Sequence, residues 1–309
     1  MSSLQCISLS DMSPVALPKA SVVCLGNFDG VHLAHRALLR EARRLCNEEF
    51  TNASCAAFCF RAPSSDFLAP DKAAHLCTLE QKLARFRNEG LDYAFLIDFP
   101  EIRDLSPEQF ATEILRDGCH AVAAVCGFNY RFGKGGKGTP ELLRSTLQIP
   151  VSVQSEIRVG DETVSSTRIR RLLTEGRVEE ANALLTRPYS FTAEVVHGKA
   201  LGQKMGFPTV NQVFPDRMLI PRHGVYVTDC EIDGKHYRGI SNVGAHPTVD
   251  TDAQINCETH ILGLSDDLYG KQITVSFLKF LRPEQKFDSI EALTAQIGRD
   301  LVAARDYRA

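Results

Sequence analysis

The sequence lacks two features that would place it outside the ordinary globular proteins. No uncharged apolar run reaches the roughly 18 residues needed to cross a bilayer, and the densest stretch, residues 121–128, has the length of a buried strand. Lysine and arginine form no block, and 35 basic residues stand against 38 acidic ones. Because binding to a phosphate backbone needs clustered positive charge, no nucleic-acid partner is expected. We predict a protein that neither spans a membrane nor binds nucleic acid.

Targeting and cysteine patterns are also missing. The first 18 residues contain no lysine or arginine, so the charged start of a secretory signal is absent and a cytoplasmic protein is expected. Ten cysteines are scattered from Cys6 to Cys257 without any Cys-x-x-Cys pair. We therefore expect single buried thiols in preference to disulfides or a zinc site.

The composition that remains is typical of a globular protein. Hydrophobic residues make up 44% and charged residues 24% of the 309 positions. This composition excludes a mainly disordered chain, a collagen and a coiled coil. At about 150 residues per domain, this length predicts two domains, each able to bury a core. The helical pattern ends at residues 186–189, so we predict one domain over residues 1–186 and another over 187–309.

In the first half, short apolar runs alternate with helical patterns. This alternation predicts an α/β domain with a parallel sheet covered by helices. Thr78 and Ser106 each have a glutamine three residues later, as in the capping box of a helix start, and Gly90 and Gly118 follow the expected helix ends. The expected strands are 21–26, 52–60, 92–99, 119–127 and 150–157, and the expected helices are 36–49, 78–89 and 106–117.

From Tyr189 onward the pattern is β-rich. Asp233 and Gly234 separate two apolar runs and supply the positive φ values of a tight hairpin turn. We predict an all-β, mostly antiparallel domain, a small barrel, followed by an amphipathic helix whose apolar face packs on the core. The expected strands are 191–198, 224–232, 235–244, 255–263 and 272–282, and the helix face is Ile290, Leu293, Ile297 and Leu301.

The strongest chemical motif is GNFDGVHLAH, residues 26–35. It follows a predicted strand and opens a helix, so Gly26, Gly30 and the amides around His32 lie where unsatisfied N–H groups and the helix dipole attract an anion. His32 and His35 are three residues apart and share one face of the first turn. Phosphate binding is favoured for this pair over metal ligation, which lacks further ligands nearby, and over solvated surface histidines.

This motif resembles the signature of nucleotidyltransferases of the HxGH type, and its GxFDGxH form is similar to that of bacterial bifunctional riboflavin kinase/FAD synthetases. Segments similar to that family follow at residues 76–93, 105–115, 127–138 and 164–181, and the similarity continues through the second half. The resemblance implies a Rossmann-like nucleotidyltransferase domain followed by a β-barrel kinase domain. It also implies ATP, riboflavin, FMN and FAD as substrates and products.

For the first half, the resemblance implies that His32, His35 and Arg170 are catalytic, with the guanidinium placed to stabilise leaving pyrophosphate. From spacing alone, residues 164–170 are equally well an N-cap followed by solvated arginines. The glycines of residues 133–138 are no P-loop, because no Lys-Ser/Thr pair follows them, yet they allow a flexible loop beside a nucleotide. The implied nucleotide-binding residues are Gly26, Phe28, Asp29, Gly30, Asn129, Ser166 and Thr167.

For the second half, residues 198–211 combine glycines, basic residues and a Pro-Thr pair, as in a loop that wraps a nucleotide before a strand. They resemble the family's ATP loop and its PTxN motif. Thr209 and Asn211 then supply oxygen ligands suited to Mg²⁺ or a similar hard cation, whereas without the resemblance they are ordinary strand-edge residues. The other implied nucleotide-binding residues are Gly198, Gly202, Gly206, Phe207 and Pro208.

Glu258 is the acidic residue in the apolar run 255–263. A charge in such a run is rarely buried without a purpose or a partner. The resemblance implies that it is the base that takes the proton from the riboflavin 5′-hydroxyl. Arg282 resembles the family's arginine near the last strand, with a surface salt bridge as the alternative.

The sequence departs from the family pattern mainly in its first half. Ala34 stands where HxGH has glycine, and its methyl group is expected to crowd a bound nucleotide. The histidine of a Phe-x-Pro-His-Pro segment is missing around Pro63, and Thr139 replaces the aspartate after the glycine loop. We therefore expect FAD synthesis to be present but weaker than FMN synthesis.

Together these features predict a bifunctional enzyme that phosphorylates riboflavin to FMN and adenylylates FMN to FAD. One alternative is a riboflavin kinase whose first domain is degenerate. Another is a non-catalytic regulator that binds flavin or nucleotide, against which the intact Glu258 and the PTVN motif at residues 208–211 count. No oligomeric state follows from the sequence.

Overall fold

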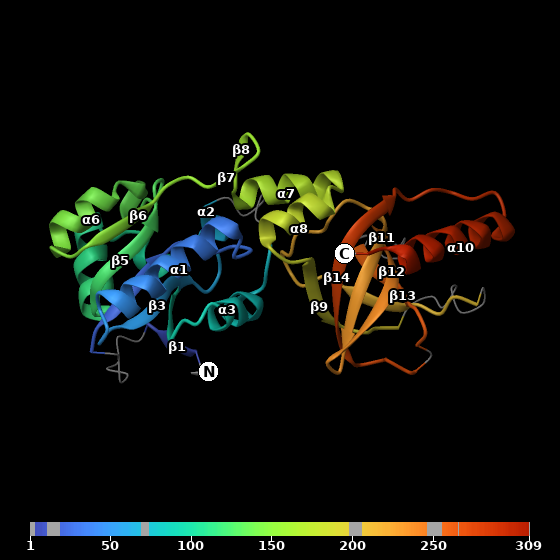
Figure 1. Cartoon of the computed structure of the whole chain (residues 1–309), viewed down its shortest axis with the longest axis horizontal. Coiled ribbons are helices and arrows are strands. Elements are labelled where there is room, and N and C mark those ends of the chain that lie inside the picture. Colours follow the sequence, from blue (N-terminus) through green and yellow to red (C-terminus); the bar gives the residue numbers. More distant parts are fainter. Residues whose placement is uncertain are drawn as a thin grey trace. The chain divides into compact units, whose positions relative to one another are not determined.

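The protein divides into two compact units, residues 1–166 and 167–309. Figure 1 shows the elements of the first unit in blue to green and those of the second in yellow-green to red. No helix within the described ranges is long and apolar enough to cross a membrane. The structure, a computed structural model, describes residues 4–10, 19–68, 74–197, 206–245, 255–264 and 266–308.

The first unit contains a six-stranded, wholly parallel sheet with the strand order β1-β4-β3-β2-β5-β6. The predicted parallel sheet is confirmed. The strands are β1 (Gln5–Ser8), β2 (Ser21–Leu25), β3 (Ser54–Phe60), β4 (Tyr93–Ile97), β5 (Ala121–Gly127) and β6 (Val151–Gln154). Strand β1 was not predicted, because a strand of four residues is too short to show an alternating apolar pattern in the sequence.

Helices cover both faces of this sheet (Figure 1). Val22 and Cys24 pack with α1 and α3 on one face, whereas Val23 and Leu25 pack with η2 and α6 on the other. This alternation produces the near-continuous burial of β2. The helices are α1 (Leu33–Glu48), α2 (Ser65–Leu68), α3 (Leu79–Asn88), α4 (Phe99–Ile102), α5 (Pro107–Gln109), η2 (Phe110–Gly118), η3 (Lys134–Gly136) and α6 (Pro140–Leu147), and a small hairpin joins β7 (Arg158–Val159) to β8 (Glu162–Thr163).

The helix caps follow the predicted signals. The side chains of Thr78 and Ser106 both accept a hydrogen bond from the backbone N–H three residues later, and both capping boxes are complete. The helix predicted over 106–117 differs in type, because after one turn of α5 it continues as the π-helix η2. Gly118 is the last residue of η2, and the left-handed residue that follows is His120, with φ of 49°.

The strand order reverses at β2, which lies between β3 and β5. The chain leaves β2 toward β3 and β4, and then crosses to β5 on the other side of β2. In open parallel sheets, ligands bind at such a switch point, outside the carboxyl ends of the strands. The residues that follow β2 and β5 therefore meet at one edge of the sheet.

The second unit contains a six-stranded antiparallel sheet with the order β10-β13-β12-β11-β14-β9. The N–H of Val196 donates a 2.8 Å hydrogen bond to the carbonyl of Asn211, which joins the two edges and curls the sheet into a half-barrel. Asp233 and Gly234 have φ values of 49° and 75°, as predicted for a hairpin turn. The strands are β9 (Tyr189–Glu194), β10 (Val210–Val213), β11 (Gly224–Ile232), β12 (Lys235–Ala245), β13 (Ile255–Ile261) and β14 (Gln272–Arg282), and the helices are α7 (Ser166–Glu175), α8 (Val178–Leu185) and α10 (Ile290–Asp306).

The predicted antiparallel domain with a terminal helix is confirmed, but two expectations about burial are wrong. Ile290 is 66% exposed because it is the first residue of α10, whereas Ile297 and Leu301 pack against the sheet. Cys6 is exposed on the edge strand β1, while the other nine cysteines are buried, and all ten are free thiols.

Candidate active sites

The loop between β2 and α1 turns through residues in the left-handed region. Phe28, Gly30 and Val31 have φ values of 50°, 78° and 41°. For Phe28 and Val31 this conformation is strained, which is typical of functional sites. Both side chains are fully buried, so packing holds the strained turn. Gly26, directly after β2, leaves room for the Phe28 ring, since a Cβ there would lie 3.3 Å from it.

His32 caps α1, and its imidazole lies against that of His35. The Nδ1 atom of His32 accepts a 3.4 Å hydrogen bond from the backbone N–H of His35. The two rings stack with their centroids 3.7 Å apart, and the Phe28 ring centroid lies 5.2 Å from that of His35. The structure thus brings both predicted histidines together in the first turn of α1, at the positive end of the helix dipole.

His35 is held as a neutral imidazole at neutral pH. Burial is the main cause that lowers its pKa well below the ordinary value, and the charges of His32 and Lys82 lower it further. Its Nδ1 atom is buried without a hydrogen-bond partner among the described residues. A neutral imidazole can still donate one hydrogen bond to a phosphate oxygen, so His35 is suited to hydrogen bonding and not to supplying positive charge.

Lys82 belongs to this site, although the sequence analysis does not single it out. Its side chain is buried, and its Nζ donates a 3.0 Å hydrogen bond to the carbonyl of Asn27 in the loop. The sequence does carry a signal for it. Lys82 lies on the same face of α3 as Leu79, Leu83 and Phe86, and a charge on an apolar helix face indicates a buried role.

Asp29 and Gly30 fasten a second segment to the loop. Asp29 is buried, and its Oδ1 accepts a 2.9 Å hydrogen bond from the N–H of Leu76. The N–H of Gly30 donates a 3.2 Å hydrogen bond to the thiol sulfur of Cys77. The Asp29 carboxylate therefore binds protein backbone in this structure and sets the position of residues 76–77.

The other predicted nucleotide-binding residues of the first half differ in position. Asn129 follows β5, the neighbour of β2, and is exposed at the switch-point edge. The Ser166 hydroxyl, at the end of the first unit, donates a 3.0 Å hydrogen bond to the carbonyl of Asp29. Thr167, which is exposed, and Arg170, which is half-buried, belong to the second unit.

The glycine loop at residues 133–138 is closely packed at its two ends. A Cβ on Gly133 would lie 2.7 Å from the backbone of Pro107, and a Cβ on Gly138 would lie 2.6 Å from the ring of Phe132. The N–H of Gly138 also donates a 2.8 Å hydrogen bond to the Phe132 carbonyl. Gly133 and Gly138 therefore serve local packing, whereas a Cβ on Gly135 or Gly136 would meet no atom closer than 3.6 Å.

The departures from the family pattern have visible local settings. Thr139 is the N-cap of α6, and its hydroxyl accepts a 3.3 Å hydrogen bond from the N–H three residues later, a role that aspartate also fills. In the segment that follows Pro63, the Nε2 of His75 lies 2.7 Å from Oδ1 of Asp66. Ala34 is half-buried in the first turn of α1.

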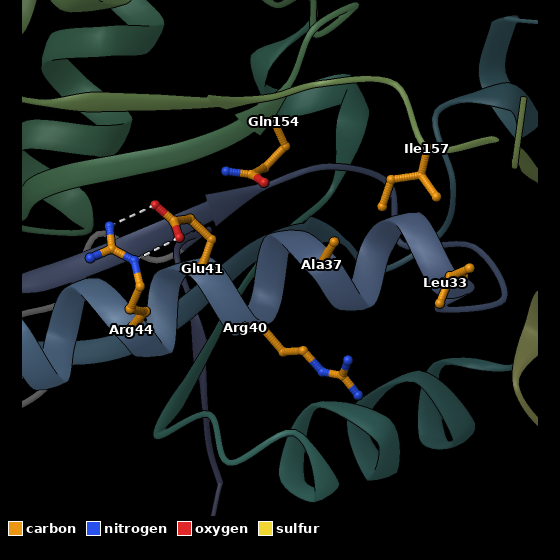
Figure 2. A pocket seen from close by; sticks show the side chains of 7 residues that line it. All are labelled: Leu33, Ala37, Arg40, Glu41, Arg44, Gln154 and Ile157. Atoms are coloured by element: carbon orange, nitrogen blue, oxygen red, sulfur yellow. Dashed lines mark hydrogen bonds and ion pairs between the residues drawn. The ribbon is translucent and has the colours of Figure 1, made fainter.

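A pocket of about 460 Å³ runs along α1 in the first unit (Figure 2). It is lined by Leu33, Ala37, Arg40, Glu41, Arg44, Gln154 and Ile157. Arg44 binds both carboxylate oxygens of Glu41, at 2.9 and 3.0 Å, and these hydrogen bonds are the main cause that lowers the Glu41 pKa. Leu33 directly follows His32, so one end of the pocket adjoins the histidines. The polar residues that line the pocket, such as Glu41 and Arg44, are not among the predicted site residues.

In the second unit, Asn211 and Glu258 are directly opposed residues of β10 and β13. Opposed residues of antiparallel strands lie on the same face, with Cβ atoms about 5 Å apart. Asn211 is buried and Glu258 is half-buried. Thr209 precedes Asn211 by two residues, the spacing that places two side chains on one face of an extended segment. The strand register therefore places Asn211 and Glu258 on one face of the sheet, and the spacing of Thr209 favours the same side just before β10.

Their chemistry fits a hard cation. A hydroxyl, an amide oxygen and a carboxylate are the donors that Mg²⁺ prefers, with the remaining positions left to water and substrate phosphates. No group of three or more His, Cys, Asp or Glu residues that could hold a metal occurs in the described part of the chain. A cation at this place would therefore depend on the oxygens of Thr209 and Asn211.

The segment before β10 is held by His260. The ring of Phe207 meets that of His260 edge-on, with centroids 5.8 Å apart, and Nδ1 of His260 lies 2.8 Å from the carbonyl of Pro208. Gly206 adopts a φ of 82°. Two further predicted residues of this loop lie outside the described residues, namely Gly198 and Gly202.

Arg282 forms an ion pair with Asp300 of α10. Its Nη2 lies 2.8 Å and its Nε 3.1 Å from Oδ2 of Asp300, and the two side chains are 16% and 6% exposed. The pair is thus largely buried, which corrects the alternative of a surface salt bridge. It attaches the terminal helix to the last strand of the sheet.

Comparison with known proteins assigns each half of the chain. The riboflavin kinase family model matches residues 185–308, and the FAD synthetase model matches residues 15–168. The bifunctional riboflavin kinase/FMN adenylyltransferase of Bacillus subtilis is 33% identical over 294 residues, which cover 93% of this chain and 92% of that protein. The protein of the same name from Pseudomonas fluorescens is 33% identical over 291 residues, covering 93% of both chains.

A solved structure agrees over nearly the whole chain. The crystal structure described as a macrolide-efflux protein from Streptococcus pneumoniae has a TM-score of 0.91 at 31% identity, covering 98% of this chain and 99% of that one. Its name differs from those of the curated relatives, whereas both family models and the relatives agree with one another. On these matches, the chain belongs to the bifunctional riboflavin kinase/FMN adenylyltransferase family of enzymes.

Proposed function

We propose that this chain makes FMN from riboflavin and then FAD from FMN, using ATP in both steps. Residues 187–309 carry the kinase reaction and residues 1–186 the adenylyltransferase reaction. The observation that carries the proposal is that the two family matches fall on different halves, each with its own set of polar groups. We place both reactions in the cytoplasm, where free thiols such as these ten persist.

In the kinase reaction, Glu258 accepts the proton of the riboflavin 5′-hydroxyl while that oxygen forms a bond to the γ-phosphorus of ATP. The bond between the γ-phosphorus and the bridging oxygen breaks, and ADP leaves. Thr209 and Asn211 would hold Mg²⁺, which would supply positive charge to neutralise the phosphates. Support comes from the register that opposes Asn211 to Glu258, because it places the base beside the proposed cation ligand.

In the adenylyltransferase reaction, a phosphate oxygen of FMN attacks the α-phosphorus of ATP, and pyrophosphate leaves. No strong base is needed, since the attacking phosphate is already an anion. The backbone N–H groups at the start of α1 and the neutral imidazole of His35 bind the phosphate oxygens, and Arg170 stabilises the charge on pyrophosphate. Support comes from the stacked His32 and His35 in the first turn of α1.

One rival function has an observation in its favour. Ala34 and the missing histidine near Pro63 both fall in the first half, so a riboflavin kinase with a degenerate first domain is the alternative. Thr139 is a third departure in the first half, and its local role in this structure is the N-cap of α6.

Incubation of the purified protein with riboflavin, ATP and Mg²⁺, followed by chromatography of the flavins, separates these functions. The proposal expects FMN to appear first and FAD to follow. Accumulation of FMN without any FAD, also when FMN is supplied directly, would support the degenerate first domain. No conversion of riboflavin at all would leave only a binding protein.

A further inference from the structure

One face of the second sheet carries a row of residues in register across five strands. The row runs through Asn211 of β10, Glu258 of β13, Asn242 of β12, Val225 of β11 and Arg282 of β14. Because opposed residues share a face, Asn242 is the direct neighbour of Glu258 on the side away from Asn211. No motif of the sequence analysis includes Asn242.

Glu284 reaches Asn242 from the other side. It follows β14 by two residues, and its Oε1 accepts a 3.1 Å hydrogen bond from Nδ2 of Asn242. An ionised carboxylate can only accept, so the amide nitrogen must face Glu284 and the amide oxygen must point elsewhere. Glu284 therefore selects one orientation of the Asn242 side chain.

Gly244 provides the space for this contact. It lies two residues after Asn242 on β12, hence on the same face. A Cβ there would overlap Oε1 of Glu284, and the nearest atoms it would meet all belong to Glu284. Gly244 is absent from the residues with positive φ, so the backbone does not require glycine. The glycine instead allows the carboxylate to lie directly on β12.

We propose that Glu284 and Asn242 are positioning residues for Glu258. Glu284 holds the Asn242 amide in one orientation, and the fixed amide closes the space on that side of Glu258. The Glu258 carboxylate is thereby directed toward the end of the row where Asn211 and Thr209 lie. This inference rests on the proposed role of Glu258 as the base of the kinase reaction.

The test compares kcat and KM for FMN formation, with the melting temperature of each variant as a folding control. Glu284→Ala, Asn242→Ala and Gly244→Ala each disturb the contact. Losing one net hydrogen bond is expected to lower kcat by roughly three- to tenfold, with KM for ATP within about twofold of wild type. Glu284→Gln keeps an oxygen that accepts from Asn242, so it should retain at least half of the wild-type kcat.

Two further variants isolate the contact from general damage. Gly298→Ala is the matched control, since an added Cβ there meets no atom within 4 Å, and its kcat should equal that of wild type. The double variant Gly244→Ala/Glu284→Ala should have the same kcat as Glu284→Ala alone, because the added methyl group then has nothing to displace. An additive loss in the double variant would contradict the proposal.

The outcome separates this inference from the function on which it rests. If Glu258→Gln retains FMN formation, the proposed base is wrong. If Glu258→Gln loses it while Glu284→Ala and Asn242→Ala keep a kcat within twofold of wild type, the base stands and the positioning role is overturned. A Glu284→Gln variant as impaired as Glu284→Ala would also overturn it, because charge and not the hydrogen bond would then matter.

Discussion

The two candidate sites are built from different kinds of atoms. In the first unit, the site lies where loops leave parallel strands, and it consists largely of backbone N–H groups at the start of α1 with His32 and His35 beside them. In the second unit, the site consists of side chains opposed across antiparallel strands, such as Asn211 and Glu258. The first therefore depends on the shape of the main chain, and the second on the identity of each side chain.

This difference explains how the two halves tolerate change. Thr139 supplies the cap of α6, a task that aspartate can also perform, and the backbone at the start of α1 supplies its N–H groups whatever the side chains are. Replacing Glu258 removes the carboxylate that performs the proposed proton transfer, and no backbone group can supply it. Substitutions around the start of α1 should thus modulate FAD formation, whereas loss of the Glu258 carboxylate should nearly abolish FMN formation.

The largest expected effect is that of Glu258→Gln. Removing a general base should lower FMN formation by about 10²- to 10⁴-fold, while conversion of supplied FMN to FAD stays close to wild type, since His32 and His35 are untouched. Both rates are measured on the same preparation by flavin chromatography.

Glu231→Gln is the matched control for this change, because Glu231 is an exposed glutamate on β11 of the same sheet. It should leave both rates unchanged. Loss of FMN and FAD formation together, in a Glu258→Gln protein that melts like wild type, would contradict the assignment of separate sites.

A smaller loss is expected for Thr209→Ala, which removes one proposed Mg²⁺ ligand and leaves Asn211 in place. The Mg²⁺ concentration needed for half-maximal kinase activity should rise on the order of tenfold. Titration of Mg²⁺ at saturating ATP measures this, with the exposed Thr192→Ala on β9 as control. An unchanged Mg²⁺ dependence would mean that Thr209 has only a structural role.

Ala34→Gly tests the first half in the opposite direction. If the methyl group crowds the nucleotide, its removal should raise FAD formation by roughly three- to fivefold, against a helix-propensity cost of about 1 kcal/mol. Ala37→Gly, one turn later on α1, carries the same cost without lying between His32 and His35. A wild-type protein whose FAD rate already matches its FMN rate would show that Ala34 impairs nothing.

The sequence predicted the elements better than it predicted the sites. Capping boxes at Thr78 and Ser106, and the Asp233–Gly234 turn, are local signals, and all are present in the structure. The row that joins Glu258 to Asn242 is not local, because strand register depends on turns and bulges far away in the chain. The place of Lys82 on an apolar helix face indicates burial, but its partner Asn27 could not be predicted, since that contact forms only when α3 packs against the loop.

The smallest expected effect concerns the protonation of two histidines, one in each unit. Their pKa values shift in opposite directions. Burial lowers the pKa of His35 well below 6.5, whereas the Asp229 carboxylate raises the pKa of His236 above it. As the pH falls below about 6.5, His35 takes up a proton in the unfolded chain but not in the folded protein. The free energy of unfolding therefore decreases as the pH falls. For exposed His236 the added stability is complete below about 6.5 and disappears as the pH rises through the higher folded value.

Titration of the histidine ring protons by NMR measures both groups in one experiment, with His35→Gln and His236→Gln to assign the signals. The His35 signal should titrate well below, and the His236 signal above, the ordinary midpoint. In addition, His35→Gln should reduce the loss of stability between about pH 6.5 and pH 5, since glutamine takes up no proton on unfolding. A His35 midpoint at the ordinary value would mean that its ring is hydrated and takes up a proton as readily as an exposed histidine does below about pH 6.5, which would contradict a buried, neutral imidazole in the first site.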